Sequence, residues 1–478
     1  MILPSLFVDS MRSLLGPDDY LRFEAALASE VPASVRVNRG KSHPETIFSG
    51  TPVSWCASGL YLDRRPTFTF DPLFHAGTYY VQEASSMFLA EGLRRYLPDE
   101  AVVALDLCAA PGGKSTLMRS LLPEGSLLVA NEVMKNRVQI LAENLTKWGH
   151  PDVVVTNSDP SAFTSLTGVF DVLLTDVPCS GEGMFRKDQV AVDEWSPANV
   201  ELCWQRQRRI LADVWPSLKP GGLLIYSTCT FNTLENEENV RWICSELGAE
   251  VLPVDTDPSW HITGNLLPDA HFPVYRFLPH RTQGEGLFLA VLRKHDDDSF
   301  DFDDFAPRKA SKREAKGKKK GSLQSGSTKE FVQKASGWLC DASNYTLQAV
   351  GDEVVACPSA HTALIDRLRS TLRVIQAGVG VGSVKGKDLI PSHALAMSTL
   401  CRRDAFVACE VDYTQAIAYL RKEAIVLPSE LERGYVLLTY RNIPLGFVKH
   451  LGNRANNLYP QEWRIRSGYL PQELIFPY

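Results

Sequence analysis

Two cysteines lie in loops that each follow an apolar, strand-like run. Cys179 stands in the segment DVPCSG after residues 172–174, and Cys229 stands in STCT after residues 223–226. Ligands of an open α/β sheet bind outside the carboxyl ends of its strands, so both thiols are predicted at a ligand-binding edge. A cysteine becomes a nucleophile when a helix N-terminus or a neighbouring group stabilises its thiolate. The two loops therefore predict nucleophilic chemistry by a thiol.

A third strand-like run ends in a segment that lets a ligand approach the backbone closely. Residues 104–115 read ALDLCAAPGGKS, with small side chains and two glycines before a predicted helix. This spacing is neither that of a P-loop nor that of the GxGxxG dinucleotide loop, and a plain strand-to-helix turn is the alternative. The candidate cofactor contacts in this segment are Cys108, Ala109, Ala110, Pro111, Gly112, Gly113 and Lys114.

Acids follow the next two strand-like runs, with Glu132 after SLLVAN and Asp159 after VVVTNS. The first position lets a carboxylate accept hydrogen bonds from both hydroxyls of a ribose, and the second lets one accept from an adenine amino group. Glu132 can also be a solvated acid at a helix start, and Asp159 with Pro160 can form a plain turn. The two positions together favour a cofactor that contains adenosine.

Composition and charge place the chain among globular proteins of several domains. It has 478 residues and a net charge of −6, which predicts roughly two to four domains and leaves any basic surface local. The sequence contains no CxxC pair, no His and Cys cluster at zinc spacing, no secretory signal and no apolar run of about 18 residues. We therefore expect a cytoplasmic monomer with free thiols, no metal and no membrane contact.

Strand-like and helical patterns alternate from residue 97 to residue 296. Short apolar runs such as VVALDL, SLLVAN, VVVTN, DVLLTD and GGLLIYS are separated by helical patterns, one of them at residues 135–148. This alternation predicts a doubly wound parallel sheet of the α/β class. Residues 1–96 carry mixed helical and strand patterns, and we expect them to form a small α+β lobe.

The chain beyond the predicted sheet begins with a charged segment. Residues 297–328 hold an acidic and then a basic block without apolar periodicity, which predicts a solvated linker, with a basic arm on phosphates as the alternative. After a connecting region at 329–385, residues 386–478 combine short strands with basic side chains, which form either a solvated face or an RNA contact. Those basic residues are Lys449, His450, Arg454, Arg464 and Arg466.

Four segments, in this order, resemble one enzyme family. DLCAAPGGKS, TDVPCSGEGMFR, YSTCTFNTLENEENV and EGLFLAVLRK are similar to motifs of the NOL1/NOP2/Sun family of RNA 5-methylcytosine methyltransferases, and VQEASS at 81–86 resembles the segment before the cofactor motif. Segments near both ends resemble a bacterial branch that methylates 16S ribosomal RNA. The resemblance implies a Rossmann-like methyltransferase domain at 97–296 that uses S-adenosylmethionine, an RNA-binding lobe at 1–96 and a PUA-like RNA-binding domain at 386–478.

The resemblance also implies a role for each candidate catalytic residue. Cys229 would be the nucleophile that adds to carbon 6 of cytosine. Asp176 would hydrogen-bond the base near N3 and its amino group and would also contact the cofactor, while Cys179 would assist loss of the carbon 5 proton and release of the enzyme. DNA cytosine methyltransferases place their nucleophile in a Pro-Cys motif like Pro178-Cys179, but the second, Thr-Cys motif decides for Cys229. Lys114 would order the site or begin a helix.

The expected partner is RNA, most directly ribosomal RNA or the small ribosomal subunit. Two other functions stay open, namely a transfer RNA cytosine-C5 methyltransferase on the same core and a ribosome-assembly factor that binds RNA without turnover. Loss of Cys229 or of the cofactor loop would have indicated the second, and both are present. A target base must leave its stack to reach a thiol at the sheet edge, which favours single-stranded or loop RNA.

Overall fold

The computed structural model describes residues 2–41, 48–296, 325–471 and 473–478. The expected charged linker and its basic arm lie outside these ranges up to residue 324, and residue 325 begins a helix. Within the described ranges, no helix is long and apolar enough to cross a membrane.

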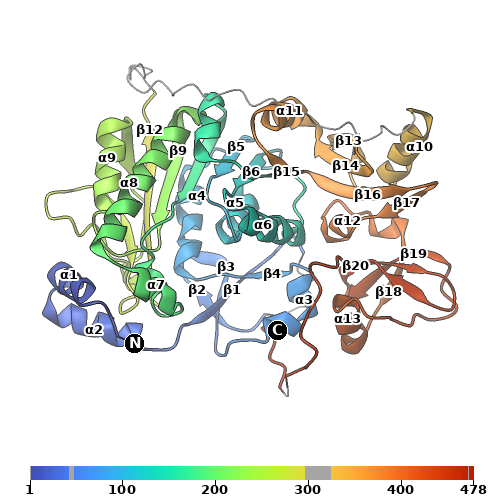
Figure 1. Ribbon diagram of the computed structural model, residues 1–478, viewed down its shortest axis with the longest axis horizontal. Helices are drawn as coiled ribbons and strands as arrows, with labels where there is room; N and C mark the ends of the chain where they lie inside the picture. Colours follow the sequence, from blue (N-terminus) through green and yellow to red (C-terminus); the bar gives the residue numbers. More distant parts are fainter. Residues whose placement is uncertain (1, 42–47, 297–324, 472) are drawn as a thin grey trace.

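The fold is organised around a nine-stranded sheet (Figure 1). Its parallel strands run in the order β7-β6-β5-β8-β9, and β12 and β10 extend it beyond β9 in antiparallel pairing. The order reverses between β5 and β8, and a ligand-binding crevice forms at such a reversal. This topology confirms the predicted doubly wound sheet. Eight of its nine strands are β5 (Val103–Asp106), β6 (Leu127–Asn131), β7 (Val153–Thr156), β8 (Phe170–Asp176), β9 (Leu218–Thr228), β10 (Ala249–Leu252), β11 (Tyr275–Phe277) and β12 (Leu287–Lys294), and the ninth is β15 (Val374–Ala377).

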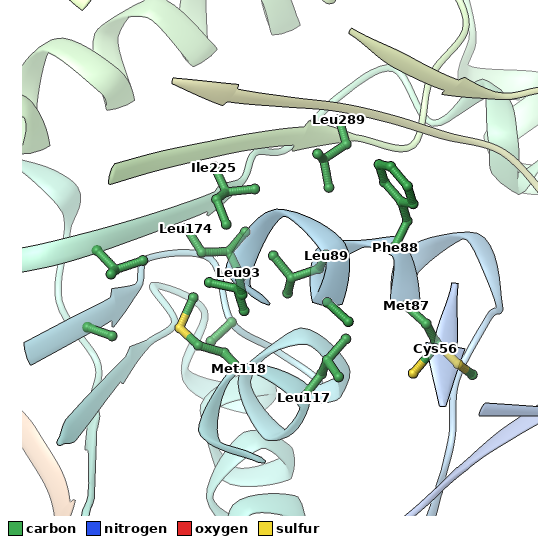
Figure 2. Packing of buried hydrophobic residues seen from close by; sticks show 14 of the residues in the cluster. Cys56, Met87, Phe88, Leu89, Leu93, Leu117, Met118, Leu174, Ile225 and Leu289 are labelled. Carbon is green, nitrogen blue, oxygen red and sulfur yellow. The ribbon is translucent and has the colours of Figure 1, made fainter. Parts of the chain in front are cut away.

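Helices cover both faces of this sheet. Leu173 and Leu174 on β8, like Leu224 and Ile225 on β9, belong to opposite cores because successive strand residues point to opposite faces. Figure 2 shows the first core, where α4 and α5 pack on Leu174, Ile225 and Leu289. The helices of the first face are α4 (Leu89–Tyr96), α5 (Gly113–Leu121) and α6 (Lys135–Trp148), and those of the second include α8 (Pro197–Val214) and α9 (Glu237–Glu246).

The first part of the chain forms two separate pieces (Figure 1). Helices α1 (Ser5–Leu15) and α2 (Pro17–Leu27) pack beside α7 (Gln189–Glu194), where the ring of Phe7 lies 5.0 Å from that of Phe185 and the ring of Phe23 lies 5.1 Å from that of Phe231. An antiparallel sheet of order β2-β3-β1-β4 follows with the short helix α3 (Pro72–His75). Its strands are β1 (Ala33–Val37), β2 (Thr51–Val53), β3 (Cys56–Leu62) and β4 (Tyr79–Val81).

The chain beyond residue 325 adds to the catalytic sheet before it forms sheets of its own. Strand β15 (Val374–Ala377) pairs with β7, and α11 (Thr362–Thr371) places Ile365 and Leu368 in the second core. The strands of a four-stranded sheet of order β13-β14-β16-β17 precede and follow α11 and β15 in the sequence. The expected boundary at 385/386 falls in the turn between β16 and β17, which pair with each other. The elements are α10 (Ser325–Ser336), β13 (Tyr345–Val350), β14 (Glu353–Pro358), β16 (Val379–Lys385), β17 (Asp388–Pro391) and α12 (His393–Met397).

A last four-stranded sheet packs against the N-terminal sheet. Val35 and Tyr79 of the N-terminal sheet share a core with Ile417 and Leu438. The sheet has the order β18-β19-β20-β21. Its elements are β18 (Val407–Glu410), α13 (Tyr413–Leu420), β19 (Gly434–Tyr440), β20 (Ile443–His450) and β21 (Ala455–Asn457). Short 3₁₀ helices are η1 (Phe68–Phe70), η2 (Ser85–Phe88), η3 (Pro160–Ser165), η4 (Glu182–Met184), η5 (Trp215–Ser217), η6 (Pro258–Trp260), η8 (Ala342–Asn344), η9 (Ser359–His361) and η10 (Arg403–Ala405).

The basic residues of this C-terminal region differ in their availability. Arg454 and Arg466 are exposed, and Arg464 is half-buried. Lys449 forms an ion pair with Asp388 at 2.7 Å, and His450 is buried. Arg454 and Arg466 are therefore the side chains of this set most accessible to a polyanion.

Gly77 joins the N-terminal sheet to the end of α6, and its replacement tests that junction. Gly77 and Gly168 both have positive φ, of 72° and 61°, but a Cβ at Gly77 would lie 1.8 Å from the Lys147 carbonyl oxygen, whereas one at Gly168 would meet nothing within 4 Å. We expect Gly168→Ala to destabilise the fold by about 1 kcal/mol and Gly77→Ala by about 2–4 kcal/mol. Urea unfolding midpoints measure the difference, and equal shifts would contradict the tight junction.

Candidate active site

Strands β8 and β9 bring the two candidate cysteines together. Asp176 at the end of β8 lies opposite Ser227 near the end of β9, and the loops that follow place the Sγ atoms of Cys179 and Cys229 3.3 Å apart. Both cysteines are partly exposed and neither forms a disulfide. Helix α9 begins only at Glu237, beyond the loop that carries Cys229. Neighbouring side chains, and not a helix start, therefore surround this thiol pair.

The two thiols stand in unequal environments. The hydrogen bond with Cys229, followed by burial, raises the pKa of Cys179 well above its ordinary value. Cys179 therefore keeps its proton near neutral pH. Either sulfur can donate in the contact between the two thiols.

A partly buried lysine, Lys114, and Asp176 form the charged pair of the site. Lys114, in the first turn of α5, places its Nζ 2.7 Å from Asp176 Oδ2, and Ser227 Oγ donates to Oδ1 at 2.8 Å. Burial alone would lower the pKa of Lys114, but the carboxylate of Asp176 outweighs burial and the pKa is raised. The pair holds the Asp176 carboxylate in one orientation beside the cysteines.

Each cysteine loop sends a carboxylate into the other loop. Glu182, from the Cys179 loop, accepts from the backbone N–H groups of Phe231 and Asn232 at 2.7 and 3.0 Å. Glu235, from the Cys229 loop, accepts from the backbone N–H of Ser180 at 3.0 Å and from its hydroxyl at 2.5 Å. We call Glu182 and Glu235 the carboxylate clamp. Because each acid satisfies donors of the opposite loop, the clamp fixes the two cysteines relative to each other.

The glutamate of the Cys229 loop, Glu235, accepts further hydrogen bonds inside the protein. Glu235 is fully buried, and it also accepts from the side chains of Gln207 and Asn232, both at 2.8 Å. Burial raises its pKa to about 7, and the hydrogen bonds from Ser180 and Asn232 oppose that rise. Gln207, on α8, also donates to the Pro178 carbonyl at 3.0 Å, so the clamp is tied to a long helix behind the site.

The loops also contact each other directly through their backbones. The N–H of Gly183 donates to the Cys229 carbonyl at 2.8 Å, and a Cβ on Gly183 would lie 2.8 Å from that same oxygen. Only glycine lets the backbones of the two loops approach this closely. The approach is a second constraint on the position of Cys229.

The glycine loop is held open beside the end of β5. Gly112 has a φ of 113°, and Arg137 donates to the Ala110 carbonyl at 2.6 Å. Asp106 is fully buried, and its Oδ2 accepts from Ser115 at 2.6 Å. Its Oδ1 has no hydrogen-bond partner in the described structure, and burial raises its pKa to about 7. An unsatisfied carboxylate oxygen at a strand end suits a ligand that carries an amino group.

The two candidate adenosine acids differ in their surroundings. Glu132 is buried and accepts from the Met134 N–H at 2.8 Å, while Arg137 lies 3.3 Å from its other oxygen. Asp159 is exposed, and its carboxylate accepts from the N–H and hydroxyl of Ser161 at 3.1 and 2.7 Å. The turn expected as the alternative at Asp159 is therefore present, and its carboxylate still faces solvent.

The remaining loop residues are attached to neighbouring elements. Ala109 donates its N–H to the Asn131 carbonyl at 2.8 Å, and the side chain of Asn144 donates to the Pro111 carbonyl at 2.8 Å. Burial, the largest effect, raises the pKa of Cys108 far above its ordinary value. Cys108 is thus a protonated packing residue beneath the loop.

The sequence motifs do not indicate the roles of several residues in the site. Glu182 and Glu235 stand in the quoted cysteine motifs, but nothing local indicates that they cross to the other loop. Arg36 of β1 donates to Thr116 Oγ1 at 2.5 Å and to Gln82 Oε1 at 2.7 Å, so the N-terminal sheet supports α5. Two features of the sequence could have identified these residues. They are the acids at fixed distances after each cysteine, and Gln82 within VQEASS.

The described residues hold no group of three or more His, Cys, Asp or Glu side chains that could bind a metal ion.

Val133 and Met134, directly after Glu132, are about half exposed at 49% and 51%. Exposed apolar side chains next to a buried acid offer a surface on which a flat ring can pack.

Comparison with protein families gives matches along most of the chain. A model described as 16S rRNA methyltransferase RsmB/F matches residues 96–293. One described as the N-terminal domain of 16S rRNA methyltransferase RsmF matches residues 3–84, and one described as the methyltransferase RsmF PUA domain matches residues 406–465. These matches confirm the predicted resemblance and the PUA-like C-terminal region.

Similar proteins carry the same description. Ribosomal RNA small subunit methyltransferase F of Serratia proteamaculans is 30% identical, covering 98% of this chain and 98% of its own. The protein of that name from Cronobacter sakazakii is 29% identical, covering 98% and 97%.

Solved structures agree in the fold of the central region. A methyltransferase homolog protein from Pyrococcus horikoshii has a TM-score of 0.52 at 28% identity, covering 61% of this chain and 95% of its own. NSun6 from the same organism, solved with SFG, has a TM-score of 0.53 at 21% identity, covering 62% and 99%.

The unequal environments of the two thiols predict how fast each is alkylated. Replacing Cys229 by Ala removes the largest cause of the raised pKa of Cys179. We expect iodoacetamide to modify Cys179 faster in Cys229→Ala than in the wild type, by about tenfold for each unit by which the pKa falls. Mass spectrometry of the Cys179 peptide at pH 8 measures the rate, with Cys244 on α9 as the internal control. Equal rates in both proteins would contradict the hydrogen bond with Cys229 as the largest cause of the raised pKa of Cys179.

Proposed function

Because the chain belongs to the RsmF family of 16S rRNA methyltransferases, we propose that it methylates carbon 5 of a cytosine in 16S ribosomal RNA. The methyl donor in this proposal is S-adenosylmethionine. The observation that carries it is the pair of thiols 3.3 Å apart beside Asp176, at the reversal point of the sheet. A target in ribosomal RNA also places the reaction in the cytoplasm.

Cys229 starts the reaction in this proposal. Its thiolate forms a bond to carbon 6 of the flipped cytosine, and the electrons of the 5,6 double bond move toward carbon 5 and the N3 edge. The cytosine ring alone is a weak carbon nucleophile, so covalent addition divides one hard step into two easier ones. Asp176, held by Lys114 at 2.7 Å, is assigned to the N3 edge and the amino group, and N3 takes up a proton from solvent as negative charge develops there.

Cys179 completes the reaction. In the resting pair it is kept protonated chiefly by its hydrogen bond with Cys229. Once the Cys229 sulfur is bonded to carbon 6, it is a neutral thioether and a much poorer acceptor. Its contribution to the raised pKa of Cys179 therefore weakens. Cys179 can then release its proton to solvent and, once carbon 5 carries the methyl group, accept the proton that carbon 5 loses. Loss of that proton re-forms the 5,6 double bond and expels the Cys229 thiolate.

The residues present fit an adenosine cofactor with an amino acid tail. Asp106 Oδ1 is buried without a partner, Gly112 has positive φ, and Glu132 lies buried at the end of β6. We assign the tail to Asp106 and the loop of residues 108–114, the ribose to Glu132 and the adenine edge to Asp159, with Asp176 contributing beside the base. When bound, S-adenosylmethionine supplies an electrophilic methyl group to carbon 5.

The RNA is proposed to contact several parts of the chain. We assign residues 1–96 and 386–478 to RNA binding and residues 97–296 to catalysis, with 329–385 as the connection. Exposed Arg454 and Arg466 support an RNA contact near the C-terminus, because phosphate contacts dominate nucleic-acid affinity. The intact pair of thiols argues against an assembly factor without turnover, since RNA binding alone requires neither.

The first prediction of this proposal concerns Cys229 and the substrate together. In a strain that lacks the gene, wild-type protein should restore bisulfite resistance to cytosine in 16S rRNA and not in transfer RNA. Cys229→Ala should not restore it, with a rate loss on the order of 10³-fold or more, although the purified variant binds S-adenosylmethionine normally. Cys244→Ala is the matched control and should behave as the wild type. Resistance confined to transfer RNA would favour the alternative substrate, and activity of Cys229→Ala would move the nucleophile elsewhere.

The second prediction separates addition from release. Cys179→Ala should leave addition by Cys229 intact and slow elimination, because no thiol is then placed 3.3 Å from the nucleophile. A covalent complex of protein and RNA should accumulate and be visible on a denaturing gel. The double variant Cys179→Ala/Cys229→Ala should give none. An adduct from Cys229→Ala and none from Cys179→Ala would reverse the two roles.

A further inference from the structure

A cavity of about 500 Å³ lies where three parts of the chain meet. Residues 37–40 at the end of β1 and 57–58 of β3 form one wall, residues 117–124 form a second, and Thr399 closes the third side. Helix α5 begins at the catalytic edge and ends before β6 starts, so the cavity lies toward the opposite edge of the sheet. None of the residues assigned to catalysis or to the cofactor lines it.

The wall of this cavity, which we call the seam cavity, carries an excess of positive charge. Arg39, Arg94 and Arg119 line it together with His150, and Glu124 is the one acid among the described residues that do so. Arg39 lies in the turn after β1, Arg94 on α4 and Arg119 on α5, so the fold gathers cations that are distant in the sequence.

The arginine of α5 is a buried charge without an ionic partner. Arg119 is 2% exposed, and its guanidinium donates to the carbonyls of Ser126, Leu122 and Pro123 at 2.5, 3.3 and 3.2 Å. Its Nε has no partner in the described structure, and no described carboxylate lies within ion-pair distance; Asp152 acts from farther away. Neutral carbonyls accept its hydrogen bonds, so only the more distant Asp152 offsets its positive charge, and a buried charge is costly unless something pairs with it.

His150 and the two exposed arginines add donors to the cavity. Asp152 donates its N–H to His150 Nδ1 at 3.2 Å, which leaves the proton of the neutral ring on Nε2. Burial, followed by the charge of Arg119, lowers the pKa of His150 to about 3, so the ring stays neutral. Arg39 and Arg94 are exposed and carry only surface contacts, to the Ala57 carbonyl and to Glu91.

We propose that the seam cavity binds a phosphate group of the RNA substrate, at a position outside the catalytic cleft. A phosphate presents only acceptor oxygens, and arginine is the side chain best suited to bind them. The cavity is large enough for a nucleotide unit, and Leu117, Leu122 and Trp148 offer apolar surface to its sugar and base. The inference rests on the RNA substrate proposed above. A free nucleotide has the same chemistry, and the experiment distinguishes the two sources.

The test compares neighbouring arginines of α4 in the full-length protein. Arg94 lines the cavity and pairs with Glu91, whereas Arg95 lies outside it and pairs with Asp255. Affinity for transcribed 16S rRNA is measured at two salt concentrations for the wild type, Arg39→Ala/Arg94→Ala and Arg95→Ala. We expect the double variant to lose affinity about tenfold and its salt slope to fall by about 1 for each phosphate contact removed. Arg95→Ala should match the wild type.

Each result has a distinct meaning. Unchanged affinity and salt slope in the double variant would overturn the proposal. Tight binding of adenosine monophosphate that depends on Arg94, with unchanged RNA affinity, would overturn RNA as the source of the phosphate. Methyl transfer to saturating 16S rRNA is measured in parallel, and we expect the double variant to raise KM with kcat retained. Failure of the wild type to methylate both that RNA and the small ribosomal subunit would instead count against the proposed function.

Discussion

The site depends on a carboxylate exchange between two loops. Glu182 leaves the Cys179 loop to bind backbone donors of the Cys229 loop, and Glu235 crosses in the opposite direction. Loops are the mobile parts of a fold, and a thiol pair on two independent loops would not keep a separation of 3.3 Å. Buried carboxylates that accept charge-assisted hydrogen bonds from both sides make the two loops one unit. The chemistry of Cys179 follows from this, because its raised pKa arises first from Cys229.

The rest of the molecule supports that unit from several directions. The reversal of strand order between β5 and β8 puts the glycine loop beside the cysteines, and Lys114 joins the two through Asp176. Helices α1 and α2 pack on the aromatic residues of the catalytic loops. Strand β15 extends the sheet at β7 from a segment beyond residue 325. The C-terminal part is thus built into the catalytic domain, and its removal would strip an edge strand and part of a core.

The sequence was sufficient for features that local patterns determine. The alternating runs predicted the doubly wound sheet, and the helix expected at 135–148 is α6. The positions of Asp176 and the cysteines at strand ends follow from the same patterns. The clamp was not predictable, because Glu182 accepts from a backbone N–H 49 residues away and nothing in its own segment identifies that partner. Strand β15 was placed in a connecting region because nothing in its four residues identifies β7 as their partner. Amphipathic patterns likewise predict helices such as α1 without indicating which surface they cover.

The central claim is that Cys229 forms the bond to the target base while the clamp holds Cys179 beside it. A 16S rRNA fragment with 5-fluorocytosine at the methylated position tests this most directly, because fluorine on carbon 5 cannot leave as a proton does and the adduct is trapped. Digestion and mass spectrometry of the trapped complex identify the attached residue. The account predicts RNA on the peptide that contains Cys229, at a yield that falls when Glu235 is replaced by Ala. Attachment to the peptide that contains Cys179 would contradict it.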